Sequence, residues 1–359
     1  MTWRDSGNLE KELEYFEYQN KKYNHEFVFI TYGDASDKKV IKNYEYIEII
    51  PIYDYLLKPN NKLLRYVNSI KIPFILKNIT GRFDVIKQNQ LLGSWVAIIF
   101  KLITRTPLII RTGYDMFTFS RHDKKSLLLQ ALYYLLTQIS ILFSNSYTVS
   151  SSIDKEFLNK TFLCSSKKIK IVPNWIDNIN FIDFKKRYQD RILCIGRLES
   201  QKNFEHLIKS FKDSEIQIDL YGEGNQKKLL LELAKSYNVK VNFLGVLPYS
   251  SLKKIYSEYK VFVSTSLFEG NPKTILEAMA AGCVIVASNN PNNKEILSNK
   301  IDGILFSFED DLKLIVENLF QDEDYLQKLS ESSYHKVMNR NSLELISKLD
   351  NRILYEYKI

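Results

Sequence analysis

Short apolar segments alternate with helical patterns along this chain, and the alternation occurs in two successive series. In the first series the expected strands lie at 26–34, 44–52, 84–90, 107–115, 146–152 and 168–177. In the second series they lie at 191–200, 216–225, 239–248, 259–270 and 282–290. Strands that alternate with helices favour βαβ units and hence parallel sheets. The sequence therefore predicts an α/β protein with two doubly wound units and a boundary near residues 181–190.

The chain of 359 residues is long enough for two domains. We expect an N-terminal domain at 1–183 and a C-terminal domain at 184–344. No clear strand precedes the helical stretch at 9–22, so we expect the opening strand of the first domain to be incomplete. Ligands bind at the carboxyl ends of strands in such sheets, which places the expected site in the cleft between the two units.

The composition indicates the cellular compartment of the protein and the kinds of partner it can bind. Three scattered cysteines form no disulfide or metal pattern, and residues 1–16 lack the apolar core of a signal peptide, so we expect a cytoplasmic protein. The net charge of +8 is uneven, because residues 61–125 contain 12 basic and 3 acidic residues. A solvated basic face and an anionic partner such as lipid head groups both explain this excess. No nucleic-acid-binding motif accompanies it.

A run without charged residues occupies 126–153 and is long enough to span a bilayer. Polar residues such as Gln130, Thr137 and Ser140 interrupt this run, and its second part has the pattern of a strand. We favour a buried helix followed by a buried strand over a segment that lies on a membrane or crosses it.

An anion site is predicted where the strand near residue 264 ends and a helix begins. Asn271 is a good N-cap, Pro272 suits the first helical position, and Gly282 ends the helix. The backbone N–H groups of residues 273–275 have no partner within the helix. Together with the helix dipole they favour a phosphate group.

Two acids, Glu269 and Glu277, flank this phosphate seat. An acid would repel phosphate, so we interpret both as acceptors for sugar hydroxyl groups rather than as acid/base catalysts. The implied ligand has phosphates in the middle and hydroxyl-rich rings at both ends, as a nucleotide-diphosphate sugar does. After Gly196, the cations Arg197 and Lys202 can stabilise a departing diphosphate without a metal. Taken alone, either cation is an ordinary surface residue.

These residues resemble the retaining glycosyltransferases of family 4 (glycosyl transferases group 1), which have the GT-B fold of two Rossmann-like domains facing each other across a cleft. The segments that carry the resemblance are IGRLESQKN, YGEGNQ, NFLGVLP, FEGNPKTILEAMAAGCVIVAS and DGILF. The resemblance implies transfer of a hexose-type sugar from a nucleotide-diphosphate sugar to a glycan or lipid-linked acceptor, with retention. It implies a role in lipopolysaccharide, capsule or exopolysaccharide synthesis. It also implies a last helix at about 345–359 that packs back on the N-terminal domain.

The resemblance gives each matching residue an expected role. Glu269 meets the donor sugar, Glu277 the ribose, and Arg197 and Lys202 the diphosphate, so the expected catalytic residues are Arg197, Lys202 and Glu269. The expected donor-binding residues are Gly196, Gly222, Gly224, Leu244, Gly245, Val246, Gly270, Asn271, Pro272, Lys273, Thr274, Ile275 and Glu277. No cofactor and no metal are expected, because the acidic run at 322–324 fits an exposed helix start better than a metal site.

The N-terminal domain departs from the family pattern in two places. Many members have a Gly-Gly loop after the first strand, where this sequence offers Gly7 and Asn8. Many also have a histidine after a later strand, where this sequence has Arg111, Tyr114 and Asp115. We treat these five as acceptor-side residues, and Asp115 fits a polar contact to the sugar or a turn equally well.

Two other functions fit part of the pattern. A GT-B nucleotide-sugar epimerase shares the architecture but needs further acid/base residues in the cleft. A non-catalytic basic module for anionic glycan or lipid would not need the full set of Arg197, Lys202, Glu269 and Glu277. As partners we expect the donor, the acceptor and an anionic membrane surface for the basic segment 61–125, and no nucleic acid. The expected location is the cytoplasm or the inner face of the cell membrane.

Overall fold

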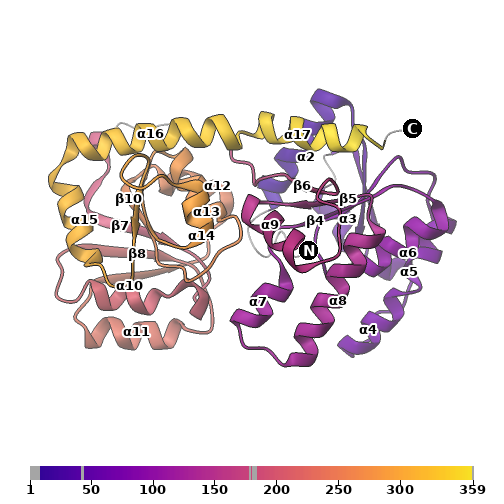
Figure 1. Ribbon diagram of the computed structural model, residues 1–359, viewed down its shortest axis with the longest axis horizontal. Helices are drawn as coiled ribbons and strands as arrows, with labels where there is room; N and C mark the ends of the chain where they lie inside the picture. Colours follow the sequence, from indigo (N-terminus) through magenta and orange to yellow (C-terminus); the bar gives the residue numbers. More distant parts are fainter. Residues whose placement is uncertain (1–8, 42–43, 178, 180–183, 358–359) are drawn as a thin grey trace. The chain divides into compact units, whose positions relative to one another are not determined.

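The computed structural model describes residues 9–41, 44–177, 179 and 184–357, and the chain divides into two compact units (Figure 1). Unit 1 consists of Met1–Val172 and Ser347–Ile359, and unit 2 consists of Pro173–Ile346. The division falls after Val172, whereas the sequence placed it after residue 183. Each unit is described separately below.

Unit 1 has two parallel sheets among its described residues. One pairs β1 (Phe27–Thr31) with β2 (Ile47–Pro51), and the other has the order β3 (Ile86–Gln88), β4 (Leu108–Thr112), β5 (Ser146–Val149) and β6 (Ile169–Ile171). The helices are α2 (Leu9–Tyr23), α3 (Ser36–Val40), α4 (Lys62–Ser69), α5 (Ile72–Ile79), α6 (Ser94–Thr104), α7 (Met116–His122), α8 (Leu127–Phe143) and α9 (Ser152–Thr161). The parallel pairing follows the alternation of strands and helices in the sequence.

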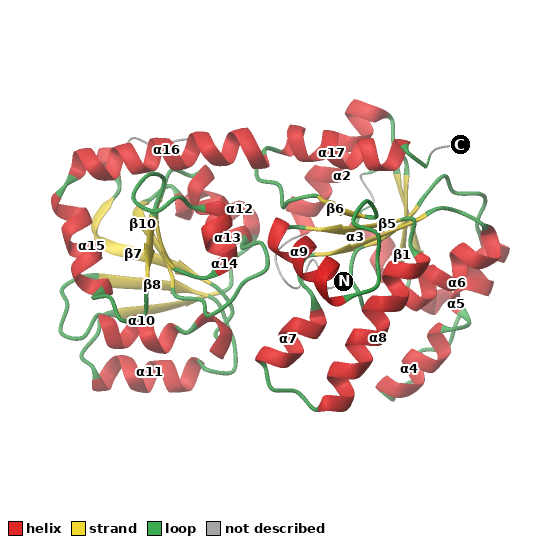
Figure 2. Ribbon diagram, in the orientation of Figure 1, coloured by secondary structure: helices red, strands yellow, loops and turns green. Residues whose placement is uncertain are grey.

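Unit 2 is built on one six-stranded parallel sheet (Figure 2). Its strand order is β12 (Ile304–Phe306), β11 (Val284–Ser288), β10 (Tyr259–Ser264), β7 (Tyr188–Ile195), β8 (Gln217–Tyr221) and β9 (Val241–Gly245). The helices are α10 (Phe204–Ser210), α11 (Lys227–Ser236), α12 (Tyr249–Tyr256), α13 (Lys273–Ala280), α14 (Pro291–Ile296), α15 (Leu312–Gln321) and α16 (Glu323–Asn341). The chain starts at the central β7, runs outward to β9 and returns to β10 on the other side. The direction therefore switches between β7 and β10, where such sheets bind ligands.

Alternate residues of the central strands enter two different cores. Val261 and Val263 of β10 pack in the core that α10, α11 and α15 cover, whereas Phe262 packs in the core of α12, α13 and α16. Successive side chains of a strand point to opposite faces, and here both faces are buried. A strand buried on both faces reads as a continuous apolar run. This explains why the sequence pattern located the fully buried strands β10 and β11, whereas the short edge strand β12 was not among the expected strands.

The uncharged run at 126–153 forms α8 and then β5, so the predicted helix and strand are confirmed. Strand β5 is buried throughout. Helix α8 is not: its buried residues are Thr137, Ser140 and Ile141, while several of its leucines are more than half exposed. The prediction of a buried helix is therefore wrong for one face of α8. Among the described residues, no helix has both the length and the apolar character needed to cross a membrane.

The acidic run at 322–324 begins α16, as the sequence predicted. The side chain of Asp322 accepts a hydrogen bond from the backbone N–H of Tyr325 at 2.9 Å and caps the helix. Glu323 pairs with the nearly buried Lys260 at 2.6 Å. Within the described part of the chain, His, Cys, Asp and Glu form no group of three that could hold a metal ion.

The last helix, α17 (Leu343–Tyr355), is attached to α2 and β3 by a buried polar cluster of unit 1. The Asp350 carboxylate accepts hydrogen bonds from the Tyr15 hydroxyl and the Lys87 ammonium group. Gln19 donates to the Ser347 carbonyl at 3.2 Å. Burial alone would raise the pKa of Asp350, but Lys87 and Tyr15 outweigh it and hold that pKa below its usual value.

Replacing Asp350 with Ala should lower the free energy of unfolding by about 3 kcal/mol, because Lys87 would lose its buried partner. Glu356→Ala is the matched control: its pair with Lys170 is half exposed and should contribute about 0.5 kcal/mol or less. Urea denaturation measures both. The folded pKa of Asp350 is lowered, so its contribution is present above the unfolded pKa of about 3.9 and disappears at lower pH. The difference in unfolding free energy between the Asp350→Ala variant and the unchanged protein should therefore become smaller in acid. A difference that does not change with pH would contradict this account.

Candidate functional site

Two loops meet at the carboxyl ends of β7 and β10, where the chain direction switches. The short 3-10 helix Ser200–Lys202 follows β7, and the loop at 265–272 follows β10. The Thr265 hydroxyl donates to the Lys202 carbonyl at 2.8 Å, and Leu267 N–H donates to the Gln201 carbonyl at 2.9 Å. Both bonds end on backbone carbonyls of the first loop and hold the two loops together.

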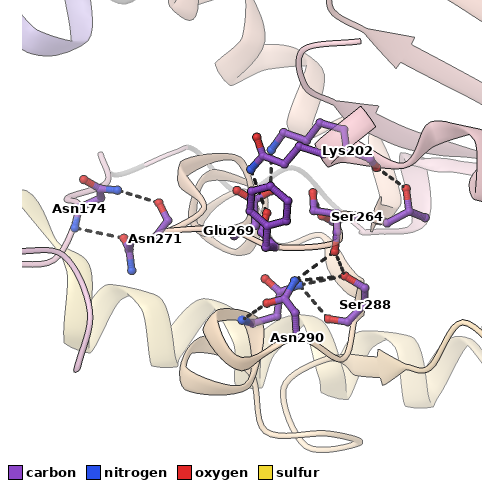
Figure 3. Close-up of polar contacts among 12 residues, drawn as sticks. Asn174, Lys202, Ser264, Glu269, Asn271, Ser288 and Asn290 are labelled. Carbon is purple, nitrogen blue, oxygen red and sulfur yellow. Dashed lines mark hydrogen bonds and ion pairs between the residues drawn. The ribbon is translucent and has the colours of Figure 1, made fainter. Parts of the chain in front are cut away.

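An ion pair joins the same two loops (Figure 3). The Lys202 Nζ atom lies 2.6 Å from Glu269 Oε1, and the two side chains are 16% and 8% exposed. The structure thus brings together two of the residues that the sequence singled out. An ammonium group has three N–H donors and a carboxylate has two oxygens, so this contact does not use the full capacity of either. A phosphate oxygen and a sugar hydroxyl are groups that such a pair can bind.

Arg197, the third expected catalytic residue, lies in a different environment. It follows β7 but its side chain is 68% exposed, and its guanidinium group donates to Glu199 at 3.2 Å. An exposed pair of this kind contributes little to stability. Arg197 therefore does not share the protected position of Lys202, although it lies on the same loop.

The predicted glycines allow backbone segments to approach closely. A Cβ atom at Gly222, which has a φ of +148°, would lie 1.8 Å from the Gly196 carbonyl oxygen. A Cβ atom at Gly224 would lie 2.4 Å from the Leu198 carbonyl oxygen. Gly222 N–H also donates to the Gly245 carbonyl at 2.8 Å. These contacts bring the loops after β7, β8 and β9 together, and only residues without a side chain fit there.

The other predicted residues of these loops lie at the ends of the same strands. A Cβ atom at Gly196 would lie 3.2 Å from the Lys202 side chain, so the glycine gives Lys202 its space. Leu244 and Val246, on either side of Gly245, are 42% and 56% exposed at the end of β9. They present an apolar surface at the sheet edge where the ligand is expected.

Helix α13 begins at Lys273, one residue later than predicted. The prediction that Asn271 is its N-cap is wrong. Pro272 occupies the cap position without a side-chain hydrogen bond. Asn271 is bound elsewhere: its Oδ1 accepts from Asn174 N–H at 3.3 Å, and its carbonyl accepts from Asn174 Nδ2 at 2.8 Å (Figure 3). Leu276 N–H makes the first helical bond, to the Pro272 carbonyl at 3.2 Å. The N–H groups of residues 273–275 therefore precede the intrahelical ladder, as the sequence predicted.

A buried arginine stabilises the carboxyl end of α13. The C-cap is Ala281, and Gly282 follows it with a φ of +73°, so the glycine lies one position beyond the cap. Arg187 is 2% exposed and donates to the carbonyls of Ala281 and Gly282, each at 2.9 Å. A cation at this end is favoured by the helix dipole. Arg187 was not predicted from the sequence, because these two carbonyls lie more than 90 residues away in the chain.

Glu277 is fixed by a residue that the sequence analysis did not single out. Glu277 is 5% exposed, and its Oε2 accepts a hydrogen bond from the hydroxyl of the fully buried Tyr256 at 3.0 Å. Burial and then the Glu277 charge raise the pKa of Tyr256 well above its usual value, so the hydroxyl stays a donor. A buried tyrosine hydroxyl usually needs a polar partner, which is the only signal that the sequence offered.

Polar side chains at the end of β11 and after it hydrogen-bond to the loop after β10. The Ser266 carbonyl accepts from Ser288 Oγ at 2.5 Å and from Asn290 Nδ2 at 3.2 Å (Figure 3). Asn290 also caps α14 through the backbone N–H of Asn293 at 2.9 Å. The start of α14 thus fixes the loop that carries Glu269. These residues, too, were missed by the sequence analysis.

The residues expected on the acceptor side have structural partners within unit 1. Arg111 donates to the Val172 carbonyl at 2.8 Å, and Asp115 caps α7 by accepting from Thr118 N–H at 2.6 Å. Burial raises the pKa of Asp115. Tyr114 is 48% exposed. The two remaining expectations, Gly7 and Asn8, lie outside the described residues.

Comparisons with known proteins show which family the second half of the chain resembles. Residues 176–336 match the family model of glycosyl transferases group 1, the family that the sequence motifs resemble. The chain is 29% identical over 245 residues to the uncharacterized glycosyltransferase MJ1607 of Methanocaldococcus jannaschii, which covers 62% of each chain. It is 31% identical to the O-antigen chain mannosyltransferase RfbU of Salmonella typhimurium, over 47% of this chain and 46% of that one.

A third relative is the N-acetylgalactosamine-N,N'-diacetylbacillosaminyl-diphospho-undecaprenol 4-alpha-N-acetylgalactosaminyltransferase of Campylobacter jejuni. It is 29% identical over 48% of this chain and 50% of its own length. The chain thus spans about half the length of the curated relatives it matches. In structure it resembles Anabaena Alr3699/HepE in complex with UDP and glucose, with a TM-score of 0.74 at 15% identity over 92% of this chain and 91% of that one. This likeness shows the GT-B fold, which confirms the predicted fold class.

Replacing Gly222 with Ala should destabilise unit 2 by at least about 1–3 kcal/mol, because a Cβ atom there adds backbone strain and a clash with Gly196. Gly81→Ala is the control, since its Cβ would meet nothing within 4 Å. That substitution should stay within about 0.5 kcal/mol of the unchanged protein. Thermal unfolding measures both, and equal midpoints for the two variants would show that the close approach is not essential.

Proposed function

We propose that this protein is a glycosyltransferase that moves a hexose-type sugar from a nucleotide-diphosphate sugar to a glycan or lipid-linked acceptor, with retention of the anomeric configuration. The observation that carries the proposal is the protected Lys202–Glu269 pair at the switch point of a parallel sheet. The match of residues 176–336 to glycosyl transferases group 1 supports it. Relatives named for O-antigen and diphospho-undecaprenol chemistry favour cell-surface polysaccharide synthesis and a lipid-linked acceptor.

The diphosphate of the donor would bind between Lys202 and the amino end of α13. Backbone N–H groups at a helix start favour anions, and the ammonium group of Lys202 adds a full charge on the neighbouring loop. As the bond between the anomeric carbon and the diphosphate breaks, negative charge grows on the leaving oxygen. Lys202 and the helix N-terminus would stabilise that charge, with Arg197 as a second and more mobile cation. This arrangement needs no metal ion, and we expect none.

The two glutamates would hold the rings at the two ends of the donor. Glu269 would accept hydrogen bonds from hydroxyl groups of the transferred sugar, and its pairing with Lys202 would link sugar position to phosphate position. Glu277, oriented by Tyr256, would accept from the ribose hydroxyls. The exposed Leu244 and Val246 would pack beside the nucleoside. The acceptor hydroxyl would attack the anomeric carbon from the side that the diphosphate leaves.

The direct test begins with a thermal-shift screen against UDP, GDP, ADP and CMP sugars, because a donor that binds the folded protein raises its unfolding temperature. The identified donor is then incubated with and without candidate lipid-linked acceptors. Release of free nucleoside diphosphate that requires the acceptor, together with a labelled glycan product, supports transfer. Donor turnover to an isomeric sugar without any acceptor would contradict it.

Replacing Lys202 with Ala should lower kcat by about 10²–10³, as loss of one preorganised charge-stabilising group does in other enzymes. Lys240→Ala is the control, because Lys240 also pairs with a glutamate, Glu215, but is 56% exposed and lies just before the amino end of β9. The control should keep full activity. Unfolding midpoints measured in parallel separate a catalytic loss from a folding defect. A folded Lys202→Ala protein with unchanged turnover would refute the role.

Replacing Tyr256 with Phe should weaken recognition of the ribose while keeping the ring in the core. Hydrogen bonds to charged groups contribute about 1.5–3 kcal/mol, so the preference for the nucleoside diphosphate over its deoxyribose analogue should fall about tenfold or more. Competitive inhibition constants for the two nucleotides measure this. Tyr325→Phe, at an exposed hydroxyl in the same unit, should leave the preference intact. An unchanged preference in Tyr256→Phe would show that Tyr256 does not act through Glu277.

A further inference from the structure

Helix α8 buries two of its polar residues and exposes most of its leucines. Thr137 and Ser140 are fully buried, and the Ser140 hydroxyl donates to Ser94 Oγ at 2.8 Å. On the opposite face lie large apolar side chains that are 43–83% exposed. This leucine stripe consists of Leu128, Leu132, Leu135, Ile139 and Leu142. The spacing of four, three, four and three residues puts all five on one face of the helix.

A stripe of this kind is unusual on a soluble surface. Single exposed leucines are normal, but contiguous exposed apolar patches mark sites for a partner protein, a ligand or a membrane. Helix α8 has no charged residue between Leu127 and Phe143 that would make its outer face compatible with water. We therefore expect the stripe to contact a partner, and the charged residues around it indicate whether that partner is a protein or a membrane.

Cations border the leucine stripe at both ends. Before the helix, Lys124 and Lys125 are exposed, and the acid of this turn, Asp123, lies 3.7 Å from Lys125. At the far end, Lys101 Nζ donates to the Phe143 carbonyl at 2.6 Å, and Lys168 Nζ donates to the Leu142 carbonyl at 2.8 Å. A second copy of the chain would bring lysines against lysines in either orientation of two paired α8 helices. An anionic surface matches both ends.

A second exposed apolar surface adjoins α8 on helix α4. Leu63, Leu64 and Val67 are more than half exposed, between the exposed Lys62 and Lys71. The pKa of Tyr133 on α8 is raised, mainly by burial and secondly by Tyr66 of α4, which lies close to it. The same combination of exposed aliphatic side chains and bordering lysines thus occurs on two neighbouring helices.

We infer that α8, with α4 beside it, docks this protein on the surface of an anionic lipid bilayer. The helix would lie along the membrane surface, with the leucine stripe at the boundary between head groups and acyl chains and the bordering lysines at lipid phosphates. The observations that carry this inference lie within unit 1 and do not depend on the proposed activity. If the proposed function is also correct, docking would place the enzyme where a lipid-linked acceptor is held.

Cosedimentation of the full chain with vesicles tests the inference. The unchanged protein should pellet with vesicles of phosphatidylcholine mixed with phosphatidylglycerol and remain in the supernatant with phosphatidylcholine alone. The variant Leu128→Gln/Leu132→Gln/Leu135→Gln should lose at least tenfold in partitioning. Lys124→Glu/Lys125→Glu should lose the preference for anionic vesicles. The matched control Leu229→Gln/Leu231→Gln/Leu314→Gln removes three exposed leucines from unit 2 and should bind like the unchanged protein.

Two results would overturn the inference. One is an unchanged protein that stays in the supernatant with anionic vesicles, and the other is a leucine-stripe variant that binds as well as the unchanged protein. A dimer in light scattering that dissociates in the stripe variant, without vesicle binding, would assign the stripe to a second copy instead. The single variant Leu128→Gln, at an 83% exposed position, replaces the triple variant if the latter unfolds at lower temperature. Transfer to a water-soluble acceptor should be equal in all folded variants, so a failure of docking is distinguishable from a failure of the proposed function.

Discussion

The close approach of backbone segments at the carboxyl ends of β7, β8 and β9 is the constraint on which the site depends. Gly222 packs against the Gly196 carbonyl, and Gly224 packs against Leu198. The loop after β8 therefore contacts the loop after β7 closely and fixes its position. The loop after β7 presents Lys202. Because β10 lies on the other side of β7, its following loop reaches Lys202 from the opposite direction. The ion pair with Glu269 can form only where these two directions meet.

The Lys202–Glu269 pair is costly to maintain, which argues for a functional reason. Two charges that are largely removed from water lose hydration, and their mutual attraction repays this loss only with good geometry. The surrounding structure supplies that geometry through Thr265 and Ser266, whose backbone and hydroxyl bonds fix the Glu269 loop. Arg187 similarly secures the far end of α13. These buried polar contacts fix the loop that carries Glu269 and the end of the helix that follows it.

The sequence predicted the features that local pattern determines and missed those that depend on distant contacts. Strands buried on both faces read as apolar runs, and the loop and helix start at 265–277 lie within one short segment, so the sequence predicted both. Asn271 has the chemistry of an N-cap, yet it binds Asn174, which lies 97 positions earlier. Helix α8 is apolar almost all round, which predicts burial. Whether a neighbouring element covers a given face is decided by tertiary packing. Among the described residues, no element covers the leucine stripe.

Asn174 also connects the site to the places where the chain enters and leaves unit 2. Its carbonyl accepts a hydrogen bond from Asn341 Nδ2 at 2.8 Å, near the end of α16. Two residues later, Ile176 N–H donates to the Asn341 carbonyl at 2.9 Å, and Leu343 N–H donates to the Ile176 carbonyl at 3.2 Å. The incoming and outgoing segments are thus bonded to each other and, through Asn174, to the loop before α13.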